Sequence, residues 1–372
     1  MTKAGARTHL HPLTSLRFFA AFLVLGFHVG GEIWLRAPWW LSNFFSNGYD
    51  AVSFFFILSG FVLSYTYGEN TGTKTFAVGP WVFWRARFAR IYPAYLLGLA
   101  IALPSFLYSL TVAKMISLPD FLTGFILVPA LCQAWWPASA TAWNVPAWSL
   151  SVEAFFYLSF PFFIRRLAKT GPLKFFTGAL VTVIVVSLLR NWLATSPEIA
   201  WTPAFRHNFV AYFPLLFLPH FIFGMALSRC FSHSHTILSL CLNRLAIPSA
   251  LVLVVLFCAR SKMPAWLVSD AFLVPLFGVV IFGTAHATGR VASILSWNPL
   301  VQLGEASYAL YILHVPLAFW FRWAALRAGF QPFDHWLGVA TFAALSVVIS
   351  YAVFIWVERP GRRLILHRLG NA

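Results

Sequence analysis

The chain has 372 residues, of which 60% are hydrophobic and only 10% charged, and its formal net charge is +16. So few charged side chains could not cover the apolar surface of a soluble domain, and the composition therefore excludes an ordinary soluble protein. The cationic residues stand between apolar runs, which argues against a nucleic-acid-binding module. Runs of about 20 apolar residues also exclude a β-barrel, whose strands need only about 10. We expect an all-α polytopic membrane protein.

Apolar runs separated by charged residues, proline or glycine predict about ten transmembrane helices. In chain order they cover 13–35, 48–67, 91–112, 148–165, 173–192, 209–229, 246–259, 269–287, 304–326 and 335–357. A further apolar run, 119–131, lies among prolines, and we expect it to be a re-entrant or interfacial segment. One transmembrane domain is therefore predicted over 1–372, with its core at about 13–358 and no appended soluble domain.

Lysine and arginine residues between the predicted spans indicate the orientation. If the N-terminus is cytoplasmic, that side collects 17 of the 26 Lys and Arg residues, and the opposite side collects eight. Cytoplasmic loops of multi-pass proteins carry the excess of positive residues. Both termini are therefore expected in the cytoplasm.

The first span carries two ionisable residues, Arg17 and His28, eleven positions apart. On a helix this spacing is about 16 Å of rise and close to three full turns, so both side chains lie on one face. Ionisable groups within a bilayer face a cavity or the bundle interior and are candidates for a functional site. The alternative is that Arg17 reaches the cytoplasmic headgroups while His28 bonds a backbone carbonyl.

Glu153 is the next intramembrane candidate, near the outer start of the fourth span in "NVPAWSLSVEAFFYLSFP". The sequence places it at a depth similar to that of His28, and a carboxylate that orients a histidine is a common arrangement for general-base catalysis. The alternative is a carboxylate stabilised by the dipole of a helix start.

Three arginines, Arg85, Arg87 and Arg90, enter the third span from the cytoplasm in "FWRARFARIYP". Arg87 and Arg90 are three residues apart and share a helix face, and paired guanidinium groups suit phosphate oxygens. Positive charge that only sets the orientation would explain them equally well. The sequence has no glycine-rich phosphate loop, so nucleotide hydrolysis is not indicated.

Six segments together resemble the membrane-bound acyltransferase family 3. They are Arg-x10-His in the first span, "NGYDAVSFFFILSGFVLS", "RFARIYP", "WSLSVEAFFY", "GEASYALYILHVPL" and "ERPGRR", which cover residues 14 to 363 in order. The family includes O-antigen and exopolysaccharide O-acetyltransferases, nodulation-factor acetyltransferases and macrolide acyltransferases.

The resemblance implies an O-acyltransferase that moves an acetyl or other short acyl group from cytoplasmic acetyl-CoA to a hydroxyl at the outer side. It implies that Arg85, Arg87 and Arg90 hold CoA phosphates and that His28 is the base or carries the acyl group, with Arg17 and Glu153 as catalytic partners. It also implies pore-lining or supporting roles, for which helix packing is the alternative, for Asp50, Ser59, Trp148, Tyr308 and His314.

The expected acceptor is a surface or lipid-linked carbohydrate, and the expected location is a bacterial inner membrane. A small molecule such as a macrolide is the alternative acceptor, and a transporter is the alternative class of protein. A transporter should show an inverted repeat, and we find none in the sequence. The four cysteines show no paired spacing, so neither a disulfide framework nor a metal site is predicted.

Overall fold

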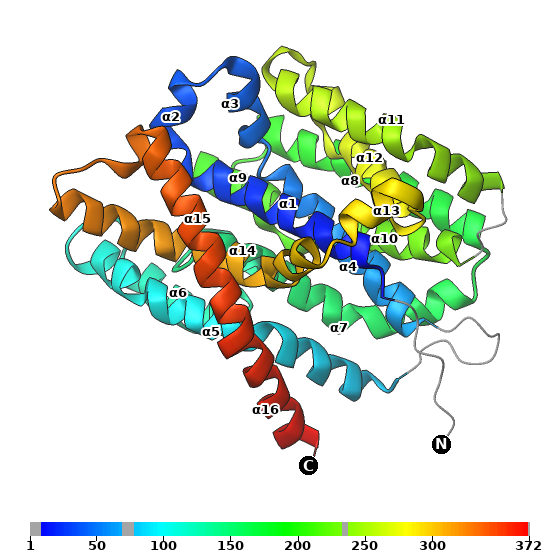
Figure 1. Ribbon diagram of the computed structural model, residues 1–372, viewed down its shortest axis with the longest axis horizontal. Coiled ribbons are helices and arrows are strands. Elements are labelled where there is room, and N and C mark those ends of the chain that lie inside the picture. The colour runs from blue at the N-terminus through cyan, green and yellow to red at the C-terminus, as the bar shows by residue number, and fades with distance from the viewer. Residues whose placement is uncertain (1–8, 69–77, 233–236, 371–372) are drawn as a thin grey trace.

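The computed structural model describes residues 9–68, 78–232 and 237–370, and all regular structure in these ranges is helical (Figure 1). The long helices pack as one bundle. They are α1 (His11–Val29), α4 (Asp50–Tyr67), α5 (Pro80–Thr111), α7 (Trp148–Ala168), α8 (Pro172–Thr195), α10 (Leu218–Phe231), α11 (Ile237–Ala259), α12 (Asp270–Ala285), α14 (Asn298–Arg327) and α15 (Trp336–Val353).

Shorter elements connect the long ones. The short α-helices are α2 (Gly31–Arg36), α3 (Trp39–Ser46), α6 (Leu118–Leu127), α9 (Pro203–Tyr212), α13 (Gly289–Leu295) and α16 (Arg359–Gly370). A π-helical turn, Phe354–Glu358, joins α15 to α16, and single 3-10 turns cover Gln133–Trp135, Pro137–Ser139, Val145–Ala147, Pro214–Leu216, Arg260–Lys262, Ala265–Val268 and Pro332–Asp334.

The predicted fold class is confirmed. Within the described ranges, nine helical segments are long and apolar enough to cross a membrane. The eighth predicted span, 269–287, corresponds to α12, which together with α13 forms a pair bent by 98°; if this pair is one span, the described part of the chain has ten. The run predicted as re-entrant or interfacial overlaps α6, a ten-residue apolar helix that is too short to cross.

Two predicted boundaries are wrong for a local reason. The first span stops at Val29 and not at 35, because Gly31 has a φ of +22° and starts the separate helix α2. The third span starts at Pro80 and not at 91, because proline suits a first helical turn and the helix runs on through Pro93 and Pro104. The arginines at 85, 87 and 90 are therefore inside a helix.

Glycines let two helix pairs approach closely, as small residues do in membrane bundles. A Cβ added at Gly224 of α10 would lie 1.9 Å from the carbonyl oxygen of Ile57 on α4, and one added at Gly60 would lie 2.0 Å from that of Phe221. Likewise, a Cβ at Gly304 of α14 would lie 2.0 Å from the carbonyl oxygen of Thr14 on α1. These contacts hold α4 against α10 and α14 against α1.

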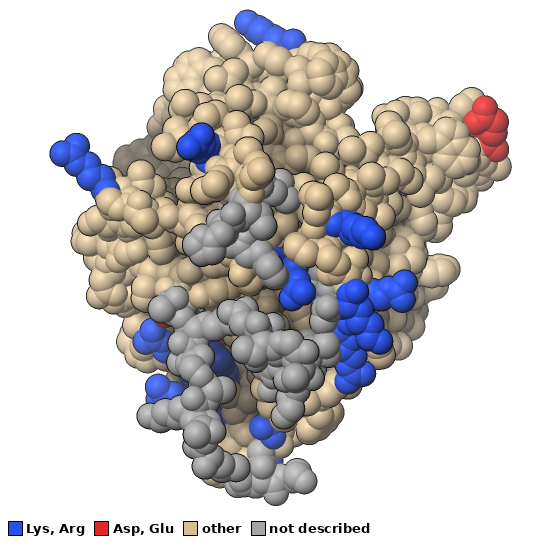
Figure 2. Space-filling view, turned by 90° about the vertical axis from the view of Figure 1, so that its right-hand side faces the viewer, with Lys and Arg blue, Asp and Glu red and all other residues tan. Residues whose placement is uncertain are grey.

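The helix α1 begins at the same end of the bundle at which α16 ends (Figure 1). We call this end the terminus end, and we call the other, where α2 and α3 lie, the far end. Lys and Arg side chains are spread over the face that Figure 2 presents, and few acidic ones are visible there. This agrees with the orientation expected from the loop charges, which would make the terminus end cytoplasmic.

Candidate functional site

Three adjoining cavities form a path through the bundle. The terminus-end cavity, of about 560 Å³, shares Arg17, Arg87 and Arg90 with a central cavity of about 140 Å³. The central cavity shares Val52 and Tyr311 with a far-end cavity of about 880 Å³. The three cavities thus follow one another from the terminus end of the bundle to the far end.

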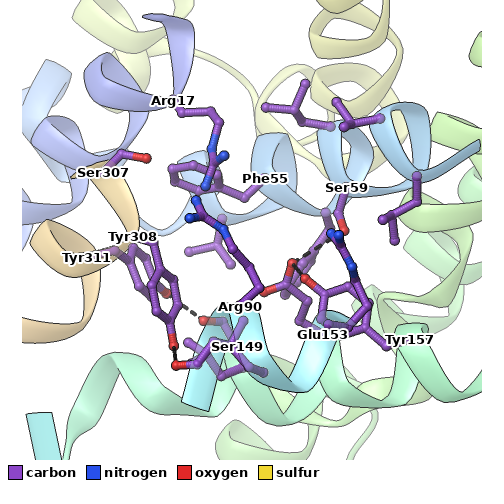
Figure 3. A pocket seen from close by; sticks show the side chains of 18 residues that line it. Arg17, Phe55, Ser59, Arg90, Ser149, Glu153, Tyr157, Ser307, Tyr308 and Tyr311 are labelled. Carbon is purple, nitrogen blue, oxygen red and sulfur yellow. Dashed lines mark hydrogen bonds between the residues drawn. The ribbon is translucent and has the colours of Figure 1, made fainter. Parts of the chain in front are cut away.

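The central cavity contains a carboxylate held by two hydroxyl groups (Figure 3). Glu153, in the second turn of α7, accepts a hydrogen bond of 2.5 Å from Tyr157 and one of 3.3 Å from Ser59 on α4. On the opposite wall, the Tyr308 hydroxyl donates to the carbonyl of Ile91 at 2.7 Å. The hydroxyl groups therefore fix the Glu153 carboxylate beside the path.

Two guanidinium groups face one another across this cavity. Figure 3 shows Arg17, from α1, and Arg90, from α5, directed toward each other. Arg17 has no hydrogen-bond or ion-pair partner among the described residues, whereas Arg87 bonds the Tyr67 hydroxyl at 3.0 Å. Like charges at close range in a low dielectric repel, so an anion placed between them would be strongly stabilised.

Arg90 already has an acidic partner, Glu358, with which it forms an ion pair. Glu358 is almost fully buried at the end of the π-helical turn, and π-helical turns in α-helices often mark functional sites. One of its carboxylate oxygens has no hydrogen-bond partner among the described residues. Glu358 was not among the residues predicted from the sequence, although an acid at the edge of an apolar run is a usable signal.

The terminus-end cavity is strongly cationic. The described residues that line it include two acids, Glu305 and Glu358, and six arginines: Arg17, Arg87, Arg90, Arg359, Arg362 and Arg363. Arg359 bonds Glu305 at 3.0 Å, and Arg90 bonds Glu358. The remaining guanidinium groups give the mouth a net positive charge that suits a polyanionic ligand.

Arg85, predicted together with Arg87 and Arg90, is placed elsewhere. Its guanidinium donates to the carbonyl of Leu369 in α16 at 2.5 Å, and it lines none of the three cavities. On a helix, residue 85 points away from the face that 87 and 90 share. The structure gives it a contact that holds α16 against α5.

His28 lies at the far-end cavity, where it contacts a second histidine. Its Nδ1 is 2.9 Å from the carbonyl oxygen of Val24 and 3.2 Å from Nε2 of His314. His314 is fully buried on α14, and its Nδ1 lies 3.2 Å from the carbonyl oxygen of Leu310. The ring of His28 is exposed and lines the cavity.

The contacts assign a tautomer to both neutral rings, because carbonyl oxygens only accept hydrogen bonds. His314 must carry its proton on Nδ1 to donate to Leu310, which leaves its Nε2 as an acceptor. Both neighbours of His28 Nδ1 are then acceptors, so this nitrogen carries the proton. His28 Nε2 keeps its lone pair for a reacting group.

The expected pairing of Glu153 with His28 is not what the structure shows. Glu153 bonds Ser59 and Tyr157 in the central cavity, and His28 bonds His314. His28 is next to the last residue of α1 and lines the far-end cavity, whereas Glu153 lies five residues after the start of α7 and lines the central cavity.

The residues predicted to support the site do not all line the same cavity. Ser59 and Tyr308 line the central cavity, and Trp148 lines the far-end cavity, where it stacks on Tyr49. Asp50 lines none of the three cavities. It forms an ion pair with Arg260 at the far end, so a supporting role behind the lining stays a prediction.

A buried ionic network beside the far-end cavity was not predicted. Arg190 lines the cavity, forms an ion pair with Asp270, and donates to the Tyr49 hydroxyl at 3.2 Å. His220 Nε2 lies 3.5 Å from the same Asp270 carboxylate. The available signal was a pair of opposite charges inside predicted spans, at 190 and 270.

Comparisons with known proteins find acyltransferases. A family model described as an acyltransferase domain matches residues 11–355. Acyltransferase MdmB of Streptomyces mycarofaciens is 28% identical over 96% of this chain and 93% of its own length. O-acetyltransferase OatA of Staphylococcus aureus is 24% identical over 98% of this chain, which spans only 59% of that protein. No solved structure matches.

Proposed function

Because the chain belongs to the acyltransferase family whose model covers residues 11–355, we propose that this multi-pass membrane enzyme is an O-acyltransferase with acyl-CoA as donor. The group moved is acetyl or another short acyl group. The acceptor is a hydroxyl of a surface or lipid-linked carbohydrate, reached from the outer side of a bacterial inner membrane. Family membership removes the transporter alternative, because the family model describes an acyltransferase.

One observation carries this proposal: an arginine-rich cavity at the terminus end is joined through the bundle to a cavity that contains a histidine at the far end. A donor with a charged head and a long apolar arm fits such a path. The phosphates of CoA would bind at the cationic mouth, and the pantetheine arm would follow the central cavity toward His28. Arg17 and His28, about 16 Å apart along α1, mark the distance that the arm has to cover.

Arg87 and Arg90 would hold the donor phosphates, since charge-assisted contacts from guanidinium groups to phosphate are strong. Arg90 would then exchange part of its interaction with Glu358 for a phosphate oxygen. Arg17, which has no partner among the described residues, would be neutralised by the same anion. Glu153 would accept a hydrogen bond from an amide of the pantetheine arm.

The transfer step would take place at His28. Its Nε2 takes the proton of the acceptor hydroxyl while the hydroxyl oxygen attacks the thioester carbonyl. The carbon–sulfur bond breaks, the imidazolium returns the proton to the CoA sulfur, and the products are an ester and free CoA. If His28 carries the acyl group instead, an acid quench of a single turnover would trap labelled acyl-enzyme.

One of the two named relatives supports an oxygen acceptor, since OatA is described as an O-acetyltransferase. A small-molecule acceptor is the alternative. Surface glycans from a deletion strain and from strains complemented with the parent or with His28→Gln can be compared by mass spectrometry. Glycans that gain an acetyl group only with the parent support the carbohydrate acceptor, and identical glycans in all three strains would contradict it.

The donor site predicts that Arg87→Gln and Arg90→Gln each weaken CoA binding by about tenfold or more, because each removes a charge-assisted contact. Calorimetric titration of CoA into the purified variants measures this. Arg85→Gln is the matched control on the same helix and should bind as the parent does. Parental affinity in both test variants would remove these arginines from the donor site.

A further inference from the structure

The far-end cavity has an unbalanced charge. The described residues that line it include two arginines, Arg190 and Arg206, and two histidines, His28 and His207, but no aspartate or glutamate. A cavity with cationic walls at the edge of a low-dielectric bundle concentrates anions and disfavours cations. Whether the cavity has a net positive charge therefore depends on whether an acidic residue neutralises each arginine.

Arg190 is neutralised from behind the cavity wall. It forms an ion pair with Asp270 and is also bonded to the Tyr49 hydroxyl, and its guanidinium lies over the Phe217 ring at 4.7 Å. Asp270 does not itself line the cavity. This network fixes Arg190 in position without leaving a free charge.

Arg206 has no such partner. Its guanidinium donates to one backbone carbonyl, that of Ile199, at 2.6 Å, and no carboxylate of a described residue forms an ion pair with it. Its Nε–H group is buried and has no acceptor within the described part of the chain. The residue as a whole is only partly buried, and its second terminal nitrogen has no hydrogen-bond partner among the described residues, so that nitrogen is open to an incoming oxyanion.

Aromatic rings complete the lining of the cavity. Phe27, exposed near the end of α1, precedes His28 in the sequence, and Trp201 and Tyr212 line the same cavity. Ring faces and edges of this kind pack against the apolar face of a pyranose. The cavity volume of about 880 Å³ is within the range of ligand sites and admits more than one sugar.

We propose that the acceptor carries an oxyanion, a carboxylate or a phosphate, that binds Arg206 while a hydroxyl of the same glycan reaches His28. This inference rests on the proposed function, because it treats the far-end cavity as the acceptor site. Arg206 then determines specificity by a charge contact. An acceptor with a basic amine in this position is disfavoured by the same cation.

Equilibrium binding of four small probes to the full chain in nanodiscs tests the proposal without requiring turnover. The probes are methyl glucoside, methyl glucuronide, glucose 6-phosphate and methyl glucosaminide, which differ mainly in charge. We expect at least one anionic probe to bind about tenfold more tightly than the neutral glucoside, and the amine to bind most weakly. The stronger of the two anionic probes identifies the oxyanion.

Variants separate Arg206 from general charge effects. Arg206→Gln should abolish the preference for anionic probes, and Arg206→Lys should keep part of it. The melting temperature of each variant is measured to show that it is folded. Arg322→Gln removes an arginine that lines none of the three cavities and should keep the preference. Equal binding of neutral and anionic probes, no binding of any probe, or an unchanged preference in Arg206→Gln would overturn the inference.

Acetyl-CoA titrated into the same samples keeps the two claims distinguishable. If acetyl-CoA binds and the probes show no charge preference, the acceptor inference fails and the acyltransferase proposal stands. If acetyl-CoA does not bind to the folded parent, the donor proposal fails, and the acceptor inference fails with it.

Discussion

His28 depends on a residue that is distant in the sequence. His314 is fully buried, and its Nε2 accepts from His28 Nδ1, which keeps the lone pair of His28 on Nε2. The sequence places Arg17 and His28 on one helix face, and the structure has both on the cavity side of α1. The His28–His314 contact could not be read from spacing, because it depends on how α14 packs on α1.

His314 is therefore predicted to be a positioning residue. His314→Phe removes the acceptor while filling the space, and we expect kcat to fall by about 100-fold with little change in KM, because a misplaced reacting group can cost that much. His314→Gln retains an acceptor oxygen and should recover part of the rate. Steady-state kinetics on both purified variants measures the effect.

A purely structural role for His314 gives a different result. The melting temperature would then fall in both variants, while turnover per folded molecule stayed near that of the parent. Equal kcat values for the Phe and Gln variants would also contradict the positioning role, since only one of them provides an acceptor.

At the scale of elements, apolar runs in the sequence predict which segments are helices but not the residues at which the helices begin and end. The first run continues through Ile33 and Trp34 in the sequence, yet Gly31 ends the α-helix and places His28 at its last turn. The arginine segment before 91 is polar enough to resemble a loop, but it is the first part of α5. Both differences affect candidate site residues: His28 lies next to the end of its helix, and Arg85, Arg87 and Arg90 lie within one.

The close contact between α4 and α10 predicts that a single methyl group added at Gly224 lowers the stability of the protein. Gly224→Ala places a Cβ 1.9 Å from the carbonyl oxygen of Ile57, so the two backbones must separate, and we expect a loss of about 1–3 kcal/mol of stability. Gly178→Ala on α8 is the matched control, because its Cβ meets nothing within 4 Å. That variant should be neutral or slightly stabilised, as alanine favours helix over glycine.

Thermal unfolding of both variants in the same detergent measures the difference. A melting temperature of Gly224→Ala equal to that of Gly178→Ala would show that α4 and α10 are not packed as closely as the structure has them.

For the whole molecule, composition alone predicts a helical membrane bundle, and the charges between spans predict its orientation. The arrangement of cavities is not predictable in this way, because each is lined by helices that are distant in the sequence, such as α1, α5 and α15 with its π-helical turn. The orientation itself remains a prediction until it is tested by labelling.

Cysteine labelling of intact cells tests the orientation. In a background with the four native cysteines replaced by alanine, Thr170→Cys, between α7 and α8, should react only with a reagent that enters the cytoplasm. Gln331→Cys, after α14 at the far end, should react with an impermeant reagent. Labelling of both by the impermeant reagent would contradict the ten-span arrangement.

The central claim is that proton transfer occurs at His28, far from the site that holds the donor's phosphates. The most direct measurement is acyl transfer and CoA affinity on the same folded His28→Gln enzyme, with His335→Gln as a control for a far-end histidine outside the cavities. We predict that transfer falls by about 10²–10⁴-fold while CoA affinity and melting temperature stay at the parental values. A folded His28→Gln enzyme with near-parental turnover would contradict the account.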